Sequence, residues 1–146
     1  MPRRRNAQVS MTKEAIDELL RGANVAVVAV TGPDGAPHAV PTWYEYRNGE
    51  IVFATDQTAF KYKCLAKDSR VTFVVDTKTP PYKAVVLKGR ATMEERVDDD
   101  RLRRMSIHYL GEKNGRRYAE QNRGPGTVWV HLKPSRVISW DYRDLL

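Results

Sequence analysis

The chain has a single cysteine, Cys64, in 146 residues. One thiol excludes an intrachain disulfide framework and any metal site built from several thiolates. The sequence also lacks a long apolar run, because the longest stretch, within NVAVVAV, is far too short to span a bilayer. No apolar segment follows the basic start MPRRRNAQVS, as a secretion signal would require. We therefore expect a cytoplasmic protein without a membrane segment.

Motifs for common catalytic and metal chemistry are missing as well. The three histidines, His38, His108 and His131, form no HExxH or HxH pattern, so we expect no metal site. No serine stands in a G-x-S-x-G context, and neither a P-loop nor GxGxxG is present. No pair of carboxylates indicates general acid–base work. The sequence therefore identifies no catalytic residue.

The net charge of +7 and the computed pI near 9.7 favour anionic partners, such as phosphorylated cofactors or nucleic acid. The basic residues are scattered over the N-terminal segment, helices and strands, without an aromatic–basic platform, so we expect no nucleic-acid binding. Residues 1–10 read as a disordered basic tail. Residues 11–146 read as one domain, because no linker divides them.

Hydrophobic periodicity and turn signals predict a mainly β fold. The predicted strands cover residues 24–32, 36–46, 50–55, 71–76, 83–95, 127–132 and 135–142. The predicted helices cover residues 11–22, 58–67, 98–110 and 114–122. Long strands joined by short turns, with one helix inserted mid-chain, indicate a small antiparallel barrel of six or seven strands with flanking helices.

The strand at residues 36–46 contains two prolines on one face, Pro37 and Pro41. Two missing backbone donors indicate an edge strand or an interrupted ladder. Backbone groups near Val40 to Trp43 could then face a ligand, with aromatic side chains beside it. The alternative is a plain edge strand whose aromatic residues belong to the core. His38 lies on this strand and is the one histidine that we would test.

The helix at residues 58–67 begins unusually. Thr58 is the expected N-cap, and a capping box would then place Glu or Gln where Lys61 stands. A cation faces the positive end of the helix dipole there, which costs very roughly 0.3–1 kcal/mol. A phosphate could be held by first-turn N–H groups, by the hydroxyls of Thr55 and Thr58, and by Lys61 or Lys63. The alternative is that Lys61 extends into solvent.

A third basic region surrounds the segment TPPYKAVVLKG. Tyr82 and Lys83 stand at the entrance of a strand, and Lys88 and Arg90 share one face of it. Basic residues on one strand face could line a groove for an anionic ligand. They could equally lie on the solvent-exposed face of a sheet whose other face is buried.

Five segments, in this order, resemble the flavin-reductase-like split β-barrel group: DGAPHAVPTWYEY, GEIVFAT, TAFKYKCLAKDSRVTFVVD, PPYKAVVLKGRA and PSRVISWDY. This group includes pyridoxamine 5′-phosphate oxidase and the smaller flavin and deazaflavin oxidoreductases. The resemblance runs from about Val25 to Tyr142. It implies a split barrel that forms a homodimer, with two cofactor sites at the interface. It also implies an oxidoreductase that uses FMN or coenzyme F420 to transfer hydride to or from a small organic substrate.

The resemblance implies site residues in four segments. Lys61 corresponds to the lysine that contacts the cofactor phosphate, and Ala54 and Thr55 lie along the cofactor. Tyr82 and Lys83 reach the cofactor from the second subunit, with Trp140 a weaker candidate. The strand with the two prolines supplies backbone contacts to the ring, through Val40, Pro41, Thr42, Trp43 and Tyr44.

The sequence departs from the group in two places. Ala59 stands where many relatives carry an arginine, which leaves Lys63, on a neighbouring turn, as its candidate replacement. The C-terminus lacks the RxH-type arginine set, so we do not expect oxidation of pyridoxamine phosphate itself. The acidic tail of F420 would suit Lys83, Lys88 and Arg90, but these residues do not separate F420 from FMN. The alternative is a non-catalytic FMN- or haem-binding protein.

Overall fold

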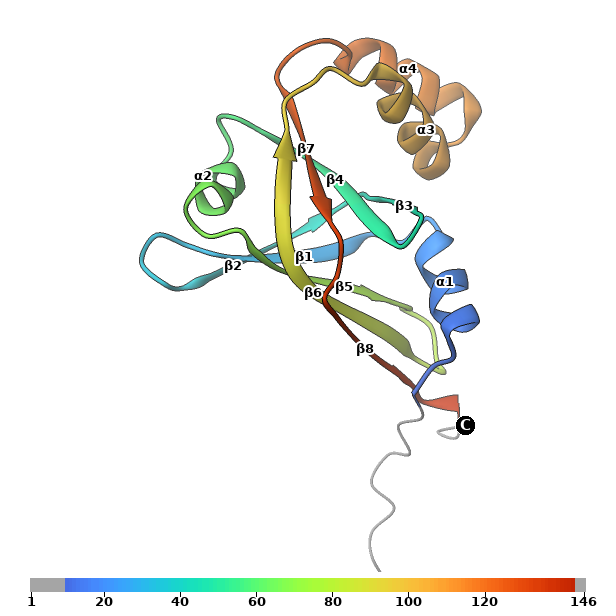
Figure 1. The fold of residues 1–146 in the computed structure, drawn as a ribbon. Coiled ribbons are helices and arrows are strands. Elements are labelled where there is room, and N and C mark those ends of the chain that lie inside the picture. The colour runs from blue at the N-terminus through green and yellow to red at the C-terminus, as the bar shows by residue number, and fades with distance from the viewer. Residues whose placement is uncertain (1–9, 144–146) are drawn as a thin grey trace, which may run out of the picture.

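A computed structural model of the chain describes residues 10–143. These residues form eight strands and four helices (Figure 1). The elements in chain order are α1 (Lys13–Arg21), β1 (Ala26–Thr31), β2 (Pro37–Thr42), β3 (Glu45–Arg47), β4 (Glu50–Asp56), α2 (Phe60–Lys67), β5 (Arg70–Asp76), β6 (Lys83–Glu94), α3 (Asp99–Leu110), α4 (Glu112–Asn122), β7 (Thr127–Leu132) and β8 (Arg136–Asp141). The predicted basic tail, apart from Ser10, lies outside the described residues. No helix in the described range is long and apolar enough to cross a membrane.

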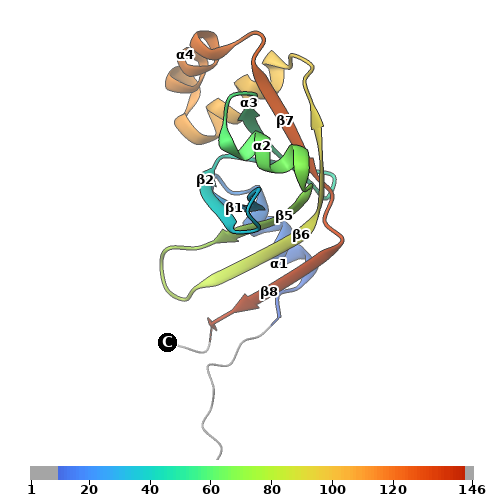
Figure 2. The same cartoon turned by 90° about the vertical axis from the view of Figure 1, so that its left-hand side faces the viewer.

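The strands form one antiparallel sheet in the order β2-β1-β5-β6-β7-β4-β3, with β8 paired to β6 off this path. The sheet curls into a half-barrel (Figures 1 and 2). This confirms the predicted mainly β fold, an antiparallel barrel with flanking helices. The described part has one strand more than the expected maximum because the segment at 36–46 forms two strands instead of one.

The break in the segment 36–46 falls at Trp43 and Tyr44, between β2 and β3. The backbone N–H of Tyr44 donates to the hydroxyl of Tyr109 at 3.1 Å, and that hydroxyl donates to the carbonyl of Asn24 at 2.7 Å. The Trp43 ring stacks on Tyr109, with centroids 4.9 Å apart and planes 6° apart. The chain therefore leaves β1 after β2 and pairs with β4 instead. The expectation of one continuous strand is wrong.

Strand β6 is shared by both halves of the curled sheet. One edge pairs with β5, and the other pairs first with β8 along Lys83–Lys88 and then with β7 along Ala91–Glu94. Gly89 lies between these two segments, where an added Cβ would sit only 3.0 Å from the carbonyl oxygen of Lys133. A side chain at Gly89 would force β6 away from the segment that connects β7 to β8.

The larger core cluster fills the barrel and is covered by α1, with Phe53, Phe73 and Val85 fully buried. A smaller cluster under the α3–α4 hairpin contains Trp129 and Met105. Helix α2 lies beside the β1–β2 hairpin at one side of the sheet (Figures 1 and 2). This arrangement brings the start of α2 next to the end of β4.

Candidate functional site

A hollow of about 380 Å³ lies where the end of β4 meets β2 and the start of α2. We call it the β4–α2 hollow. The residues that line it are His38, Val40, Ala54, Thr55, Asp56, Ala59, Phe60, Lys61 and Thr127. It therefore joins the two segments that the sequence singled out, the strand with two prolines and the helix with a lysine in its first turn.

Helix α2 starts without a side-chain cap. Its N-cap is Ala59, and the helix begins at Phe60. The predicted cap, Thr58, is wrong because both its backbone N–H and its hydroxyl donate to the carboxylate of Asp56, at 2.7 and 2.6 Å. The first-turn N–H groups are thus left without the usual side-chain acceptor, which an anion can replace.

Lys61 does not extend into solvent. Its ammonium folds back over β4, donates to the carbonyl oxygen of Ala54 at 3.3 Å and lies 5.3 Å from the centroid of the Phe53 ring. Burial lowers the pKa of Lys61. Within residues 10–143 no carboxylate lies within 4.0 Å of this ammonium. The attraction between an anionic ligand and a partly desolvated ammonium is stronger than that between the same ligand and a fully hydrated ammonium.

Thr55 places a second polar group in the wall of the hollow. The residue is 8% exposed, and its hydroxyl is buried without a hydrogen-bond partner. Buried polar groups in folded proteins are nearly always paired, so an unpaired one needs an explanation. A ligand oxygen in the β4–α2 hollow would supply the missing partner.

Asp56 lines the same hollow and carries the opposite charge. Hydrogen bonds from the hydroxyl and the backbone of Thr58 lower the pKa of the exposed Asp56 carboxyl, so it stays ionised at neutral pH. Its carboxylate is held by Thr58 and forms no ion pair with Lys61. A bound anion would therefore sit on the Lys61 and Thr55 side, with Asp56 marking the opposite edge.

A second hollow of about 380 Å³ adjoins the first and shares Ala54, Asp56 and Thr127 with it. We call it the β4–α4 hollow. The remaining residues that line it are Thr42, Trp43, Leu102, Met105, Tyr118, Asn122, Pro125 and Gly126. The Trp43 ring, with Tyr118 tilted against it at 5.3 Å, offers a flat surface for an aromatic ring. The two hollows together form an extended groove with a cation at one end and aromatic rings at the other.

No cluster of three or more His, Cys, Asp or Glu side chains in the described part of the chain is arranged to hold a metal ion. A sequence model of the pyridoxamine 5′-phosphate oxidase family matches residues 12–141. The chain belongs to this family. A comparison with curated proteins found no match.

Solved structures share the fold of this family member. A conserved hypothetical protein of Mycobacterium tuberculosis superposes with a TM-score of 0.77 at 26% identity, over 95% of this chain and 90% of that one. An F420 reductase gives 0.68 at 16% identity, over 83% and 94%. A haem storage protein of Vibrio cholerae gives 0.67 at 12% identity, over 88% and 94%. At such identities the last two show the common fold alone.

The groove in this family member collects about half of the predicted site residues. Those that line one of the two hollows are Val40, Thr42, Trp43, Ala54, Thr55 and Lys61. Pro41 is exposed on β2 beside them, and Thr58 and Lys63 are exposed near the start of α2. Tyr82, Lys83 and Trp140 line neither hollow, because they lie on or beside the paired strands β6 and β8. Lys88 and Arg90 are exposed on β6.

Sequence reasoning missed several residues of the groove. Phe60 is 48% exposed and lies edge-on to His38, with ring centroids 4.9 Å apart. Its position in the first turn of α2 is the signal that could have found it. Tyr118 and Asn122 come from α4, about 60 residues further along the chain, and nothing in their local pattern indicates a site. His38, the one histidine singled out, does line the β4–α2 hollow.

Thr55→Val should affect stability and ligand binding of this family member in opposite directions. Valine has the same shape but lacks the unpaired hydroxyl, so the ligand-free protein should gain about 1 kcal/mol of stability. Urea unfolding measures this gain, and titration with a phosphate-bearing ligand should show weaker binding. Thr92→Val, at an exposed position on β6, is the control and should change neither quantity much. A loss of stability in Thr55→Val would contradict the unpaired state of the hydroxyl.

Proposed function

We propose that this protein is an oxidoreductase that binds FMN or coenzyme F420, with the cofactor phosphate in the β4–α2 hollow. One observation carries the proposal: the uncapped start of α2 and the partly buried Lys61 line the same hollow, and the unpaired hydroxyl of Thr55 is buried in its wall. Each of these groups lacks an anionic partner within the described residues, and one phosphoryl group would satisfy all of them.

The remainder of the groove suits the ring system of such a cofactor. Val40 on the edge strand β2 lines the β4–α2 hollow, and Thr42 and Trp43 line the β4–α4 hollow. The bound cofactor supplies the hydride chemistry, whereas the protein binds and orients it. Because the cofactor carries out the chemistry, the site needs no acid–base pair of side chains, and none is recognisable among the residues that line the groove. Asp56, at the boundary of the two hollows, would face the middle of the ligand and favour donor groups there.

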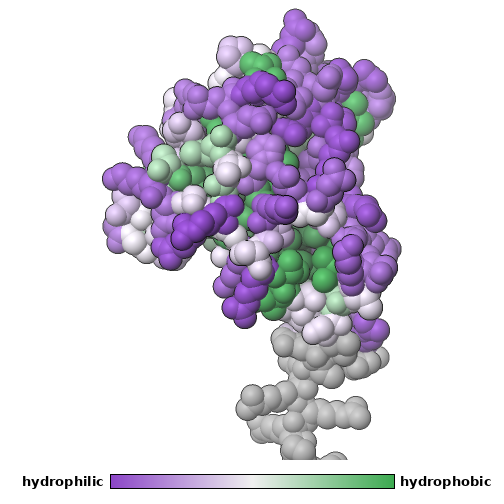
Figure 3. All heavy atoms as spheres, in the orientation of Figure 1, coloured by the Kyte–Doolittle hydropathy of each residue, from purple (hydrophilic) through white to green (hydrophobic). Residues whose placement is uncertain are grey.

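A homodimer would complete the site, and members of this family are typically dimers. Figure 3 shows hydrophobic side chains gathered low on one face of the molecule. Val137 on β8 is 46% exposed, and Tyr82, next to the start of β6, is 43% exposed. Apolar surface of this kind is typical of a subunit interface. In the proposed dimer, Tyr82, Lys83 and Trp140 of one subunit approach the cofactor held by the other. Native mass spectrometry should then find two chains and two cofactors per assembly.

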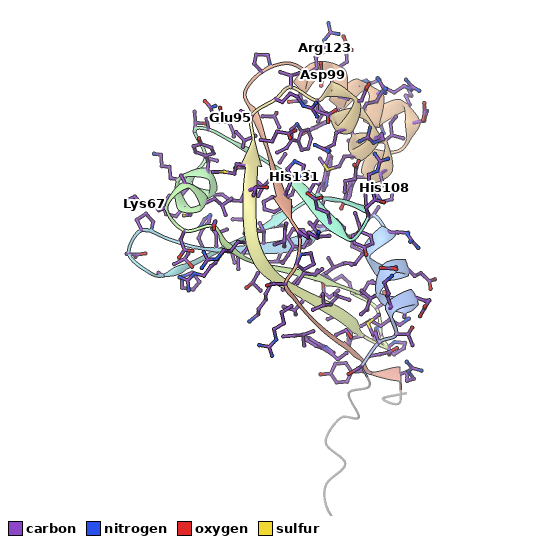
Figure 4. All side chains as sticks on the ribbon, in the orientation of Figure 1. Lys67, Glu95, Asp99, His108, Arg123 and His131 are labelled. Atoms are coloured by element: carbon purple, nitrogen blue, oxygen red, sulfur yellow. The ribbon has the colours of Figure 1, made fainter. Side chains whose placement is uncertain are left out.

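Lys61→Ala tests the phosphate assignment. We expect the dissociation constant for FMN or F420 to rise by about tenfold or more, because a charge-assisted hydrogen bond contributes roughly 1.5–3 kcal/mol. Fluorescence titration measures the change. Lys67→Ala is the matched control, because Lys67 is an exposed lysine in the last turn of the same helix (Figure 4). Equal affinity of Lys61→Ala and the unmodified protein would refute the assignment.

The identity of the cofactor can be decided by incubating the protein with FMN and with F420 separately, followed by native mass spectrometry. The two cofactors share a ribityl phosphate, so Lys61 is expected to serve either. A visible spectrum of the purified protein separates both from the alternative, since a Soret band would indicate a haem-binding protein instead of an oxidoreductase.

A further inference from the structure

A separate pocket of about 250 Å³ lies between α1, β3 and α3. It shares no lining residue with the β4–α2 hollow. Its floor is apolar, since Leu20, Tyr44 and Met105 are 1%, 2% and 4% exposed. We call it the α1–α3 pocket. An apolar floor that stays open to solvent is suited to the hydrocarbon part of a small ligand.

The rim of the α1–α3 pocket is basic. Arg104 donates two hydrogen bonds to the carboxylate of Glu45, at 3.1 and 3.2 Å. Arg47 and Arg101 approach the same carboxylate at 3.7 and 3.8 Å. Three guanidinium groups thus surround one carboxylate whose side chain is 12% exposed. Arg101 also approaches Asp98 at 3.4 Å, so three guanidinium groups share two carboxylates and leave one net positive charge. Arg47 is the least compensated of the three, because it only approaches Glu45 at 3.7 Å and its side chain is 60% exposed at the pocket.

The positive charge continues beyond the pocket. An adjoining hollow of about 500 Å³ is lined by Lys13, Arg21 and Arg47, and its one acid is Asp17. The carboxylate of Asp17 accepts a hydrogen bond from the hydroxyl of Tyr46 at 2.6 Å and forms no ion pair within residues 10–143. A low-dielectric floor beside several cations of one sign raises the local concentration of anions.

We propose that the α1–α3 pocket binds a small organic anion, a carboxylate on a short apolar body. The ligand carboxylate lies at the exposed guanidinium of Arg47, beside Arg104, because guanidinium groups form charge-assisted hydrogen bonds with carboxylates, and the apolar body covers Leu20 and Met105. His108, in the last turn of α3, also lines the pocket (Figure 4). This site is additional to the proposed cofactor groove. Met105 lines both the α1–α3 pocket and the β4–α4 hollow, so a ligand here touches a wall of that groove.

Calorimetric titration with octanoate tests the proposal, with octanol as the uncharged analogue of equal length. We expect saturable binding of octanoate and much weaker binding of octanol. The double variant Arg47→Gln/Arg104→Gln should raise the dissociation constant for octanoate by about tenfold or more, because two charge-assisted contacts are lost. Arg103→Gln is the control, since Arg103 is an exposed arginine of α3 that pairs with Asp100 and does not line the pocket. It should bind octanoate normally.

The position of the ligand is checked by the NMR signal of the Met105 methyl group, which should shift on addition of octanoate in the unmodified protein. Absence of saturable binding would overturn the proposal. Equal binding by the double variant and the unmodified protein would do so as well. Loss of octanoate binding in Lys61→Ala would place the anion in the β4–α2 hollow and equally overturn it. Unchanged binding in Lys61→Ala would support the separate site.

Discussion

Replacing Phe53 by alanine is expected to lower the free energy of unfolding by about 3–5 kcal/mol, the usual cost of removing a large aromatic side chain from a packed core. Phe53 is 0% exposed and stacks on Phe73, with ring centroids 5.5 Å apart. Its ring also lies under the ammonium of Lys61. The cavity would therefore open directly beneath the proposed phosphate site, and the variant should lose both stability and affinity for FMN.

Urea unfolding monitored by circular dichroism measures the effect on stability. Phe60→Ala is the matched control, because Phe60 is 48% exposed and should cost at most about 1 kcal/mol. Both variants lose the same side chain, so burial accounts for most of the contrast. Similar losses in the two variants would show that β4 is not the buried strand described.

Gly115→Ala should destabilise the protein, although the same change stabilises most helices by up to about 1 kcal/mol. An added Cβ at Gly115 would lie only 2.4 Å from the Cα of Ile107 and 2.5 Å from its backbone nitrogen. These are backbone atoms of α3, so no side-chain rotation can relieve the contact. The two helices must move apart, and overpacking of this kind costs about 1–3 kcal/mol.

Thermal unfolding of Gly115→Ala and of Asn114→Ala separates crowding from helix propensity. Asn114 is exposed on the same helix, so its replacement should be neutral or slightly stabilising. Because α4 carries Tyr118 and Asn122 of the β4–α4 hollow, a displaced helix should also alter ligand affinity. A Gly115→Ala protein that is more stable than the unmodified one would contradict the close packing of α3 against α4.

Local signals in the sequence predicted the elements whose partners lie nearby in the chain. Thr12 caps α1, because its hydroxyl accepts a hydrogen bond from the N–H of Ala15, three residues away. The two prolines predicted an edge strand, and β2 pairs with β1 and no other described strand. Such features depend on backbone chemistry that each residue carries with it.

Features that depend on distant partners were not predictable. The break at Trp43 and Tyr44 requires the hydroxyl of Tyr109, which lies 65 residues further along the chain. Thr58 fails as a cap for a reason that lies close by in the sequence. The carboxylate of Asp56, two residues earlier, accepts hydrogen bonds from both the N–H and the hydroxyl of Thr58, in a turn that competes with capping.

The candidate site was predicted along one side only. The segments around Val40 and Lys61 were identified because prolines and a misplaced cation stand out in a sequence. The opposite side is formed by Tyr118 and Asn122, ordinary residues on an amphipathic helix, and only the packing of α4 brings them to the groove. Tyr82, Lys83 and Trp140 remain predictions that depend on a second subunit.

The position of the two prolines in β2 has a consequence for solubility. Pro37 and Pro41 are four positions apart, so both of their nitrogen atoms point to the same edge of the strand, the one turned away from β1. Of the three residues whose backbone faces outward there, only Ala39 retains an N–H. A strand of another molecule would find too few backbone donors to pair with β2. The free edge of the sheet is therefore protected against the edge-to-edge pairing that leads to fibrils.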